Sequence, residues 1–141
     1  MRVSAKVDYA LRATLELAAA PPGPVKGERI ATAQAIPGKF LENILLDLRH
    51  AGIVGSQRGA EGGYFLARPA EEISVADVIR AVEGPIASVR GERPENVAYE
   101  GSASALRETW LDLRAAMRGV LEETSLADLV TRAGTPPRTV A

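Results

Sequence analysis

The sequence predicts a mainly α-helical fold with one small β-hairpin, in the order of a winged helix-turn-helix followed by a long dimerisation helix. Apolar residues recur at helical spacing in three consecutive segments before residue 53. A glycine-rich turn between two short strand-like stretches follows them. Three helices and then a hairpin are the order of a winged helix-turn-helix, which is a DNA-binding architecture. A heptad-like apolar stripe in the last third of the chain predicts the long helix.

Caps and breakers delimit the first three helices. The first is expected over 4–20, because Ser4 is a good N-cap residue and PPGP stops the segment. A short second helix is expected over 26–35. The third follows, with proline near its start and Gly52 as its C′ glycine. Its apolar stripe is expected to face the core and comprises Phe40, Leu41, Ile44, Leu45 and Leu48.

The remaining elements follow in order. Segments 53–57 and 64–67 are the expected strands of the hairpin. The next helix is expected over 74–84, between a serine N-cap and a terminal glycine. Residues 85–104 form a polar loop, 105–133 a dimerisation helix with a short terminal helix, and 134–141 a tail. Residues 1–84 would then be the DNA-binding domain. The stripe expected at a dimer interface comprises Leu106, Trp110, Leu113, Met117, Val120 and Leu121.

Composition excludes several classes of site. The chain has 141 residues, which suits one domain with an oligomerisation arm. It has no cysteine and one histidine, which excludes disulfides, cysteine-held iron–sulfur clusters and multi-histidine metal sites within one chain. His50 is expected in the last turn of a helix, where a histidine interacts favourably with the helix dipole, and we do not expect it to act as a ligand. No apolar run is long enough for a membrane span, and the charged N-terminus lacks a signal-peptide pattern, so we expect a cytoplasmic protein.

Charge is divided unevenly between the two halves. Residues 1–70 contain nine Lys and Arg against six Asp and Glu, a net charge of +3. Residues 71–141 contain eight against twelve, a net charge of −4. A basic first half favours contact of that half with a polyanion.

Four linked motifs resemble a known family. The segments MRVSAKVDYALRA, IPGKFLENILLDLRHAGIV, RGAEGGYFLARP and ISVADVIRAVEG together resemble the Rrf-two family of bacterial winged-helix transcription regulators. The resemblance implies a homodimer, crossed through the long helix, that binds a palindromic double-stranded DNA operator. We therefore expect a sequence-specific regulator that acts as a repressor. Each subunit would place its third helix in the major groove and its wing along the backbone or in the minor groove.

The expected DNA contacts combine this resemblance with side-chain chemistry. Arg58 at the wing tip suits a phosphate or a narrow minor groove, the alternative being a solubilising turn residue. Lys39 lies in the first turn of the third helix, where a cation interacts unfavourably with the helix dipole, which suggests a binding partner outside the protein. Glu42 and Asn43 suit cytosine and adenine edges, whereas Tyr9 is expected in the core. The full expected set is Arg2, Lys6, Lys26, Arg29, Lys39, Glu42, Asn43, Arg58, Gly59, Gly62, Gly63 and Tyr64.

The chain departs from the family at the sensing loop. The resemblance implies three cysteines there, whose places fall near Glu92, Ala98 and Ser104, with Arg107 where one relative has a histidine ligand. We therefore expect no iron–sulfur cluster, and Asp8 loses the ligand role that an acidic residue has there in some relatives. The loop is the expected place for a small-molecule or protein effector.

Two alternative functions are open to a chain of this kind. A winged-helix module can also serve protein–protein contacts alone, but the basic, glycine-rich wing favours DNA. An enzyme is disfavoured because the sequence has no nucleophile–base pair and because RGAEGG lacks the Gly-Lys-Ser/Thr of a phosphate-binding loop.

Overall fold

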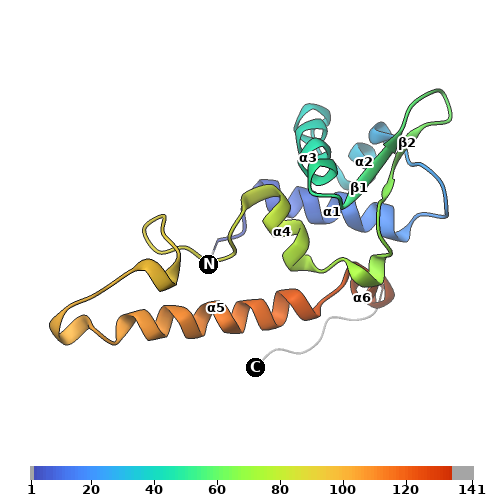
Figure 1. The fold of residues 1–141 in the computed structure, drawn as a ribbon. Helices are drawn as coiled ribbons and strands as arrows, with labels where there is room; N and C mark the ends of the chain where they lie inside the picture. Colours follow the sequence, from blue (N-terminus) through green and yellow to red (C-terminus); the bar gives the residue numbers. More distant parts are fainter. Residues whose placement is uncertain (1, 135–141) are drawn as a thin grey trace.

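The elements come in the predicted order in the computed structural model, which describes residues 2–134 (Figure 1). The tail predicted from residue 134 lies outside the described residues from 135 onward. The helices are α1 (Ala5–Ala19), α2 (Gly27–Gln34), α3 (Gly38–His50), α4 (Val75–Glu83), α5 (Leu106–Glu123) and α6 (Leu126–Arg132). The strands are β1 (Val54–Gln57) and β2 (Gly63–Leu66), and one-turn 3₁₀ helices are η1 (Ala70–Glu72), η2 (Pro94–Asn96) and η3 (Gly101–Ala103).

Helix α1 forms the centre of the helical body. Ser4 caps it as predicted, since its hydroxyl accepts a hydrogen bond from the Val7 N–H at 3.1 Å. Its buried face includes Val7, Leu17 and two alanines, and small side chains there let neighbouring helices approach closely. Helices α2, α3, α4 and α6 all pack against it.

Helix α3 confirms most of its predicted stripe. Four of the five apolar residues are buried, and Gly52 takes a φ of +75° directly after the helix, as a C′ glycine does. The prediction for Phe40 was wrong, because its side chain is 43% exposed. It lies at the margin of the buried face and packs edge-on against Tyr9, with ring centroids 5.4 Å apart.

A short segment of the α1–α2 link pairs with the outer strand of the hairpin. Strands β1 and β2 pair antiparallel, with Val54 opposite Leu66 and Gln57 opposite Gly63. Val25, in the link between α1 and α2, exchanges two backbone hydrogen bonds of 2.8 Å with Tyr64. The link is thereby fixed along the outer edge of the hairpin.

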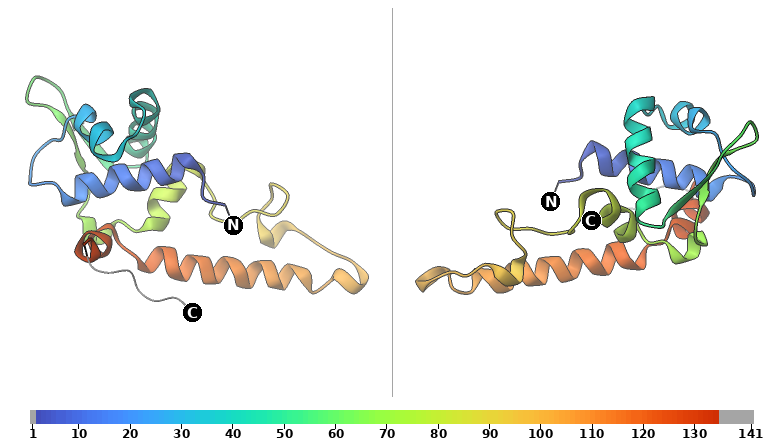
Figure 2. Two further views of the ribbon diagram at one scale, coloured as in Figure 1. Left: turned by 180° about the vertical axis from the view of Figure 1, so that it is seen from behind. Right: turned by 45° about the horizontal axis from the view of Figure 1, so that its top comes forward.

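The two C-terminal helices behave differently. Helix α5 runs past α4 and extends beyond the other helices, whereas α6 returns beneath α1 (Figures 1 and 2). Leu126 of α6 is fully buried, and its N–H donates to the Ile73 carbonyl at 2.9 Å. The Val75 N–H donates to the Thr124 carbonyl, also at 2.9 Å. Helix α6 therefore packs in the core with the first four helices, although the sequence placed it with the dimerisation helix.

The connection over 85–104 is largely irregular, as predicted, but it is anchored on α5. Pro94 and Val97 are buried. The Trp110 Nε1–H of α5 donates to the Tyr99 hydroxyl at 2.9 Å. Across residues 2–134, no helix is long and apolar enough to cross a membrane.

Candidate nucleic-acid interface

Helix α3 presents a polar face opposite its buried one. Glu42, Asn43 and Lys39 are all exposed, since the neighbouring leucines and isoleucine fill the core. No acidic residue lies in the first turn, so Lys39 is there without a carboxylate to offset its effect on the helix dipole. The exposed face offers a carboxylate, an amide and an ammonium within two turns, which are groups that contact base edges and phosphates.

The wing, which is the β1–β2 hairpin with its turn (residues 54–66), carries Arg58 exposed at its tip. Gly59 has a φ of +105°, a conformation that favours glycine. A Cβ on Gly62 would lie 2.0 Å from the Gln57 carbonyl oxygen, and one on Gly63 would lie 2.5 Å from the Val25 carbonyl oxygen. The fold itself therefore requires Gly62 and Gly63, independently of any approach by DNA.

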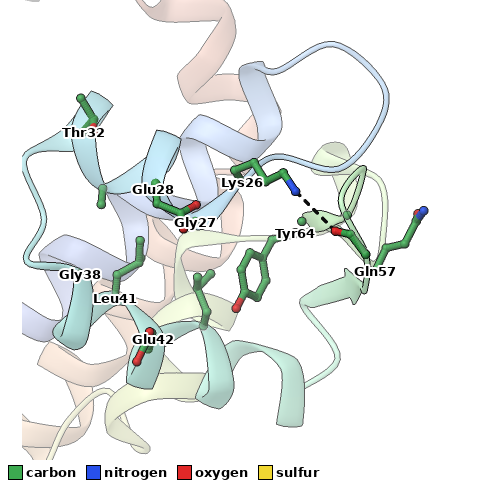
Figure 3. Close-up of a pocket in the computed structure, with 14 residues that line it drawn as sticks. Lys26, Gly27, Glu28, Thr32, Gly38, Leu41, Glu42, Gln57 and Tyr64 are labelled. Carbon is green, nitrogen blue, oxygen red and sulfur yellow. Dashed lines mark hydrogen bonds between the residues drawn. The ribbon is translucent and has the colours of Figure 1, made fainter.

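Lys26 holds the wing turn in place. Its ammonium donates to the Ala60 carbonyl at 2.5 Å and lies 3.5 Å from the Gly59 carbonyl. Figure 3 shows the side chain reaching from the start of α2 to the wing. The sequence predicted Lys26 only as a phosphate contact, because a pairing across 34 residues leaves no local signal.

A groove of about 520 Å³ lies between α2, α3 and the wing. Tyr64 projects from β2 into the space between the two helices (Figure 3). Six of the predicted residues line this groove together: Lys26, Glu42, Gly59, Gly62, Gly63 and Tyr64. Residues that the sequence reasoning missed are Glu28, Thr32 and Gln57. The i, i+4 spacing of Glu28 and Thr32, on the side of α2 away from buried Ile30, was an available signal.

The other predicted cations lie at various distances from this groove. Arg29 is exposed on α2, beside the groove-lining Glu28. Lys6 is engaged by Asp47 of α3 in an ion pair of 2.8 Å. Arg2 lies instead beside α5, lining a cavity with Trp110. The geometry thus groups most of the predicted set around α3 and the wing, and separates Arg2 from it.

Helix α5 leaves much of its apolar stripe uncovered. Leu106, Leu113 and Val120 are 38%, 47% and 67% exposed, and none of the eighteen residues of α5 is buried. Leu121 differs from the rest of the predicted set because it packs against the core of its own chain. A long helix with an open apolar stripe suits packing against another helix.

The positions that the sequence resemblance assigned to cluster ligands hold other groups. Ala98 has no donor atom, and the Arg107 guanidinium donates to the Glu95 carbonyl at 3.0 Å. Within residues 2–134, no three His, Cys, Asp or Glu side chains come together as a set that could hold a metal ion. His50 lies exposed in the last turn of α3, as predicted. The residues present therefore do not fit an iron–sulfur cluster.

Comparison with known proteins agrees with this architecture. Residues 3–132 match the family model Rrf2, described as an iron-dependent transcriptional regulator. A protein of Mycobacterium tuberculosis that carries the name of an HTH-type transcriptional regulator is 53% identical over 130 residues, covering 92% of this chain and 81% of the relative. The regulator CymR of Bacillus subtilis is 37% identical over 132 residues, covering 93% and 91%.

Solved structures give the same result. The structure of CymR, the global cysteine regulator of B. subtilis, superposes with a TM-score of 0.81 at 36% identity and covers 94% of this chain and 98% of that one. The T. potens IscR structure superposes with a TM-score of 0.78 at 32% identity, covering 99% and 94%. With its winged helix-turn-helix and its family match over nearly the whole described chain, this protein belongs to the Rrf2 family of transcriptional regulators.

Proposed function

We propose that this chain is a sequence-specific DNA-binding regulator that acts in the cytoplasm as a homodimeric repressor, without catalysis and without an iron–sulfur cluster. The observation that carries the proposal is the groove between α2, α3 and the wing, flanked by the exposed polar face of α3 and by Arg58. An α-helix fits the major groove of B-DNA, and a neighbouring hairpin can follow the backbone or enter the minor groove.

DNA recognition would use two kinds of contact, one to phosphates and one to base edges. Arg29, Lys39 and Arg58 supply positive charge to phosphates, which gives affinity that falls as salt rises. Glu42 and Asn43 supply a hydrogen-bond acceptor and an amide to base edges, which gives selectivity. Lys26 contributes mainly by fixing the wing turn.

The open stripe of α5 supports a homodimer. Two copies that pair through α5 would place two α3 helices on one face of a duplex, so their half-sites would be about one helical turn apart, or a multiple of it. A repressor of this kind needs only to occupy a promoter, which requires no catalytic group.

The absence of cysteine supports a regulator that does not sense through an iron–sulfur cluster. The 85–104 connection, which packs on α5 through Tyr99 and Trp110, is the proposed place for an effector. Movement of this connection would change how α5 is held against α4.

The test is selection of genomic DNA fragments by the full chain, followed by fluorescence anisotropy on the best fragment. We expect a pseudo-palindromic site, and we expect Glu42→Ala to lose about 1–3 kcal/mol of discrimination at one base position per half-site. The matched control is Glu71→Ala, which removes an exposed carboxylate from η1, outside the groove. Equal binding of every sequence by the native chain would favour a protein-contact module instead.

A further inference from the structure

A separate cavity on the side of α4 that faces α5 is lined by several arginines. The arginine pocket has a volume of about 300 Å³ and lies between the C-terminal end of α4, the start of the 85–104 connection and α5. Its guanidinium groups belong to Arg80, Arg93, Arg114 and Arg118. Its other lining residues are Gly84, Pro85, Ile86, Ala87 and Glu95.

The charges of the arginine pocket do not balance. Arg80 pairs with Glu122, and Arg114 pairs with Glu95, the one acidic residue of the lining. Among the described residues, Arg93 and Arg118 make no side-chain hydrogen bond or ion pair. After both ion pairs are counted, two positive charges remain.

This concentration is unexpected from the composition of the surrounding chain. Residues 71–141 carry a net charge of −4, yet four of their eight cationic residues line one small cavity. All eight are arginines, and the three lysines of the chain lie in its first half. Like charges that line one cavity repel one another, so a counter-ion would relieve an unfavourable arrangement.

We propose that the arginine pocket binds a small oxyanion with two negative charges, carried by carboxylate, phosphate or sulfate groups. The planar guanidinium matches the paired oxygens of these groups and binds them with two parallel hydrogen bonds. Half-buried Ile86 and Ala87 offer a short apolar wall for the hydrocarbon part of an organic dianion. The partial negative charge at the C-terminal end of α4 opposes an anion, but it is about half a unit and the guanidinium charge exceeds it.

The position gives the ligand a mechanical role. Arg80 belongs to α4, which packs against α1 and α3, whereas Arg114 and Arg118 belong to α5. Arg93 belongs to the connection between them. A dianion would join all three parts, and would stabilise one placement of α5 against the helical body. An effect on DNA affinity rests on the proposed function, but binding of the anion does not.

The experiment is isothermal titration calorimetry of the full chain, without DNA, in a chloride buffer. The probes are inorganic phosphate and succinate. The variants Arg93→Gln and Arg118→Gln each remove one guanidinium that makes no hydrogen bond or close ion pair within the described chain, although the charge of Arg93 also acts on Glu95. Circular dichroism checks that both variants fold. The matched control is Arg90→Gln, which removes the same charge from the same connection outside the pocket.

The native chain is expected to bind one probe anion per chain in a saturable way. Each pocket variant is expected to weaken this binding about tenfold, the loss typical of one charge-assisted hydrogen bond, and Arg90→Gln less than about twofold. Binding of phosphate alone would identify a phosphate- or sulfate-type ligand, and binding of succinate alone a dicarboxylate. Two results would overturn the proposal: no saturable heat with either probe up to about 10 mM, or an equal loss in Arg90→Gln.

Discussion

At the scale of single residues, the wing shows one residue that reaches outward and two that hold the fold. Arg58 is exposed at the tip, whereas Gly62 and Gly63 pack backbone against backbone. The sequence analysis predicted all three as DNA contacts, because a glycine that the turn requires cannot be told in the sequence from a glycine that lets DNA approach. Only the distances to the Gln57 and Val25 carbonyls separate the structural role from the binding role.

Arg58→Ala is expected to weaken binding to all DNA sequences by a similar factor. The guanidinium would contact phosphates, which carry no sequence information. The slope of log affinity against log salt should fall by about one for each lost phosphate contact. Anisotropy across a salt series measures this slope, with Arg90→Ala as the control for a general loss of positive charge. An unchanged slope would show that the wing tip does not contact DNA.

Gly62→Ala is expected to destabilise the folded chain by about 2 kcal/mol or more, because the added Cβ would lie 2.0 Å from a backbone oxygen. The matched control is Gly38→Ala in the first turn of α3, where an added Cβ meets no atom within 4 Å. Because alanine favours helix over glycine, that control should stabilise by up to about 1 kcal/mol. Urea unfolding monitored by circular dichroism distinguishes the two. Equal stabilities would mean that the wing does not adopt the described turn.

At the scale of elements, local sequence patterns predicted the helices but did not predict contacts between segments that are distant in the sequence. Ser4 and Ser74 predicted the starts of α1 and α4, because an N-cap side chain accepts a hydrogen bond from an N–H only three residues further along the chain. The burial of Leu126 against Ile73 joins positions more than fifty residues apart, and no local pattern carries it. The prediction that Phe40 is buried was wrong for a related reason. Helical spacing predicts which side of α3 faces the core, but it does not predict which residues at the edge of that side stay exposed.

The start of α6 makes a pH-dependent contribution. The Ser125 hydroxyl accepts from the Asp128 N–H, and the Asp128 carboxylate accepts from the Ser125 N–H, each at 3.0 Å. The Ser125 N–H first, and the Ser125 hydroxyl second, hydrogen-bond the Asp128 carboxylate and lower its pKa below the ordinary value of 3.8. A lowered pKa means that the contribution is present above pH 3.8 and is lost as the pH falls through the lowered pKa.

An NMR titration of the Asp128 carboxyl should give this lowered pKa, and Ser125→Ala should move it back toward 3.8. The substitution removes the hydroxyl that accepts from the Asp128 N–H and bonds its carboxyl. Glu71→Ala is the control, since it changes a nearby exposed charge without touching the cap. An Asp128 pKa that does not respond to Ser125→Ala would contradict this capping arrangement.

The open face of α5 predicts association. Leu113→Glu places a charge in the middle of the stripe and is expected to weaken the dimer at least about tenfold, because burying an unpaired carboxylate is costly. Ala115→Glu, which adds the same charge on the far side of the helix, is the control. Sedimentation equilibrium measures both. A dimer that survives Leu113→Glu unchanged would place the interface elsewhere.

At the scale of the whole molecule, a compact helical body carries α3 and the wing, and α5 extends from it (Figures 1 and 2). Helix α6 fixes the C-terminal end of α5 to the body through buried Leu126. The arginine pocket lies where the C-terminal end of α4, the proposed effector connection and α5 meet. Any ligand that alters this junction would change the spacing of two α3 helices in a dimer. The sequence predicted α4, the 85–104 connection and α5, but not that four of their arginines come together in one pocket.

Recognition of DNA sequence by α3 and the wing is tested most directly by the affinity of the full chain for its selected palindrome relative to a shuffled duplex. Both are measured by anisotropy at the same physiological salt. We expect a preference of about a thousandfold or more for the palindrome, with two chains bound per duplex. A ratio near one would show that α3 and the wing do not read DNA sequence.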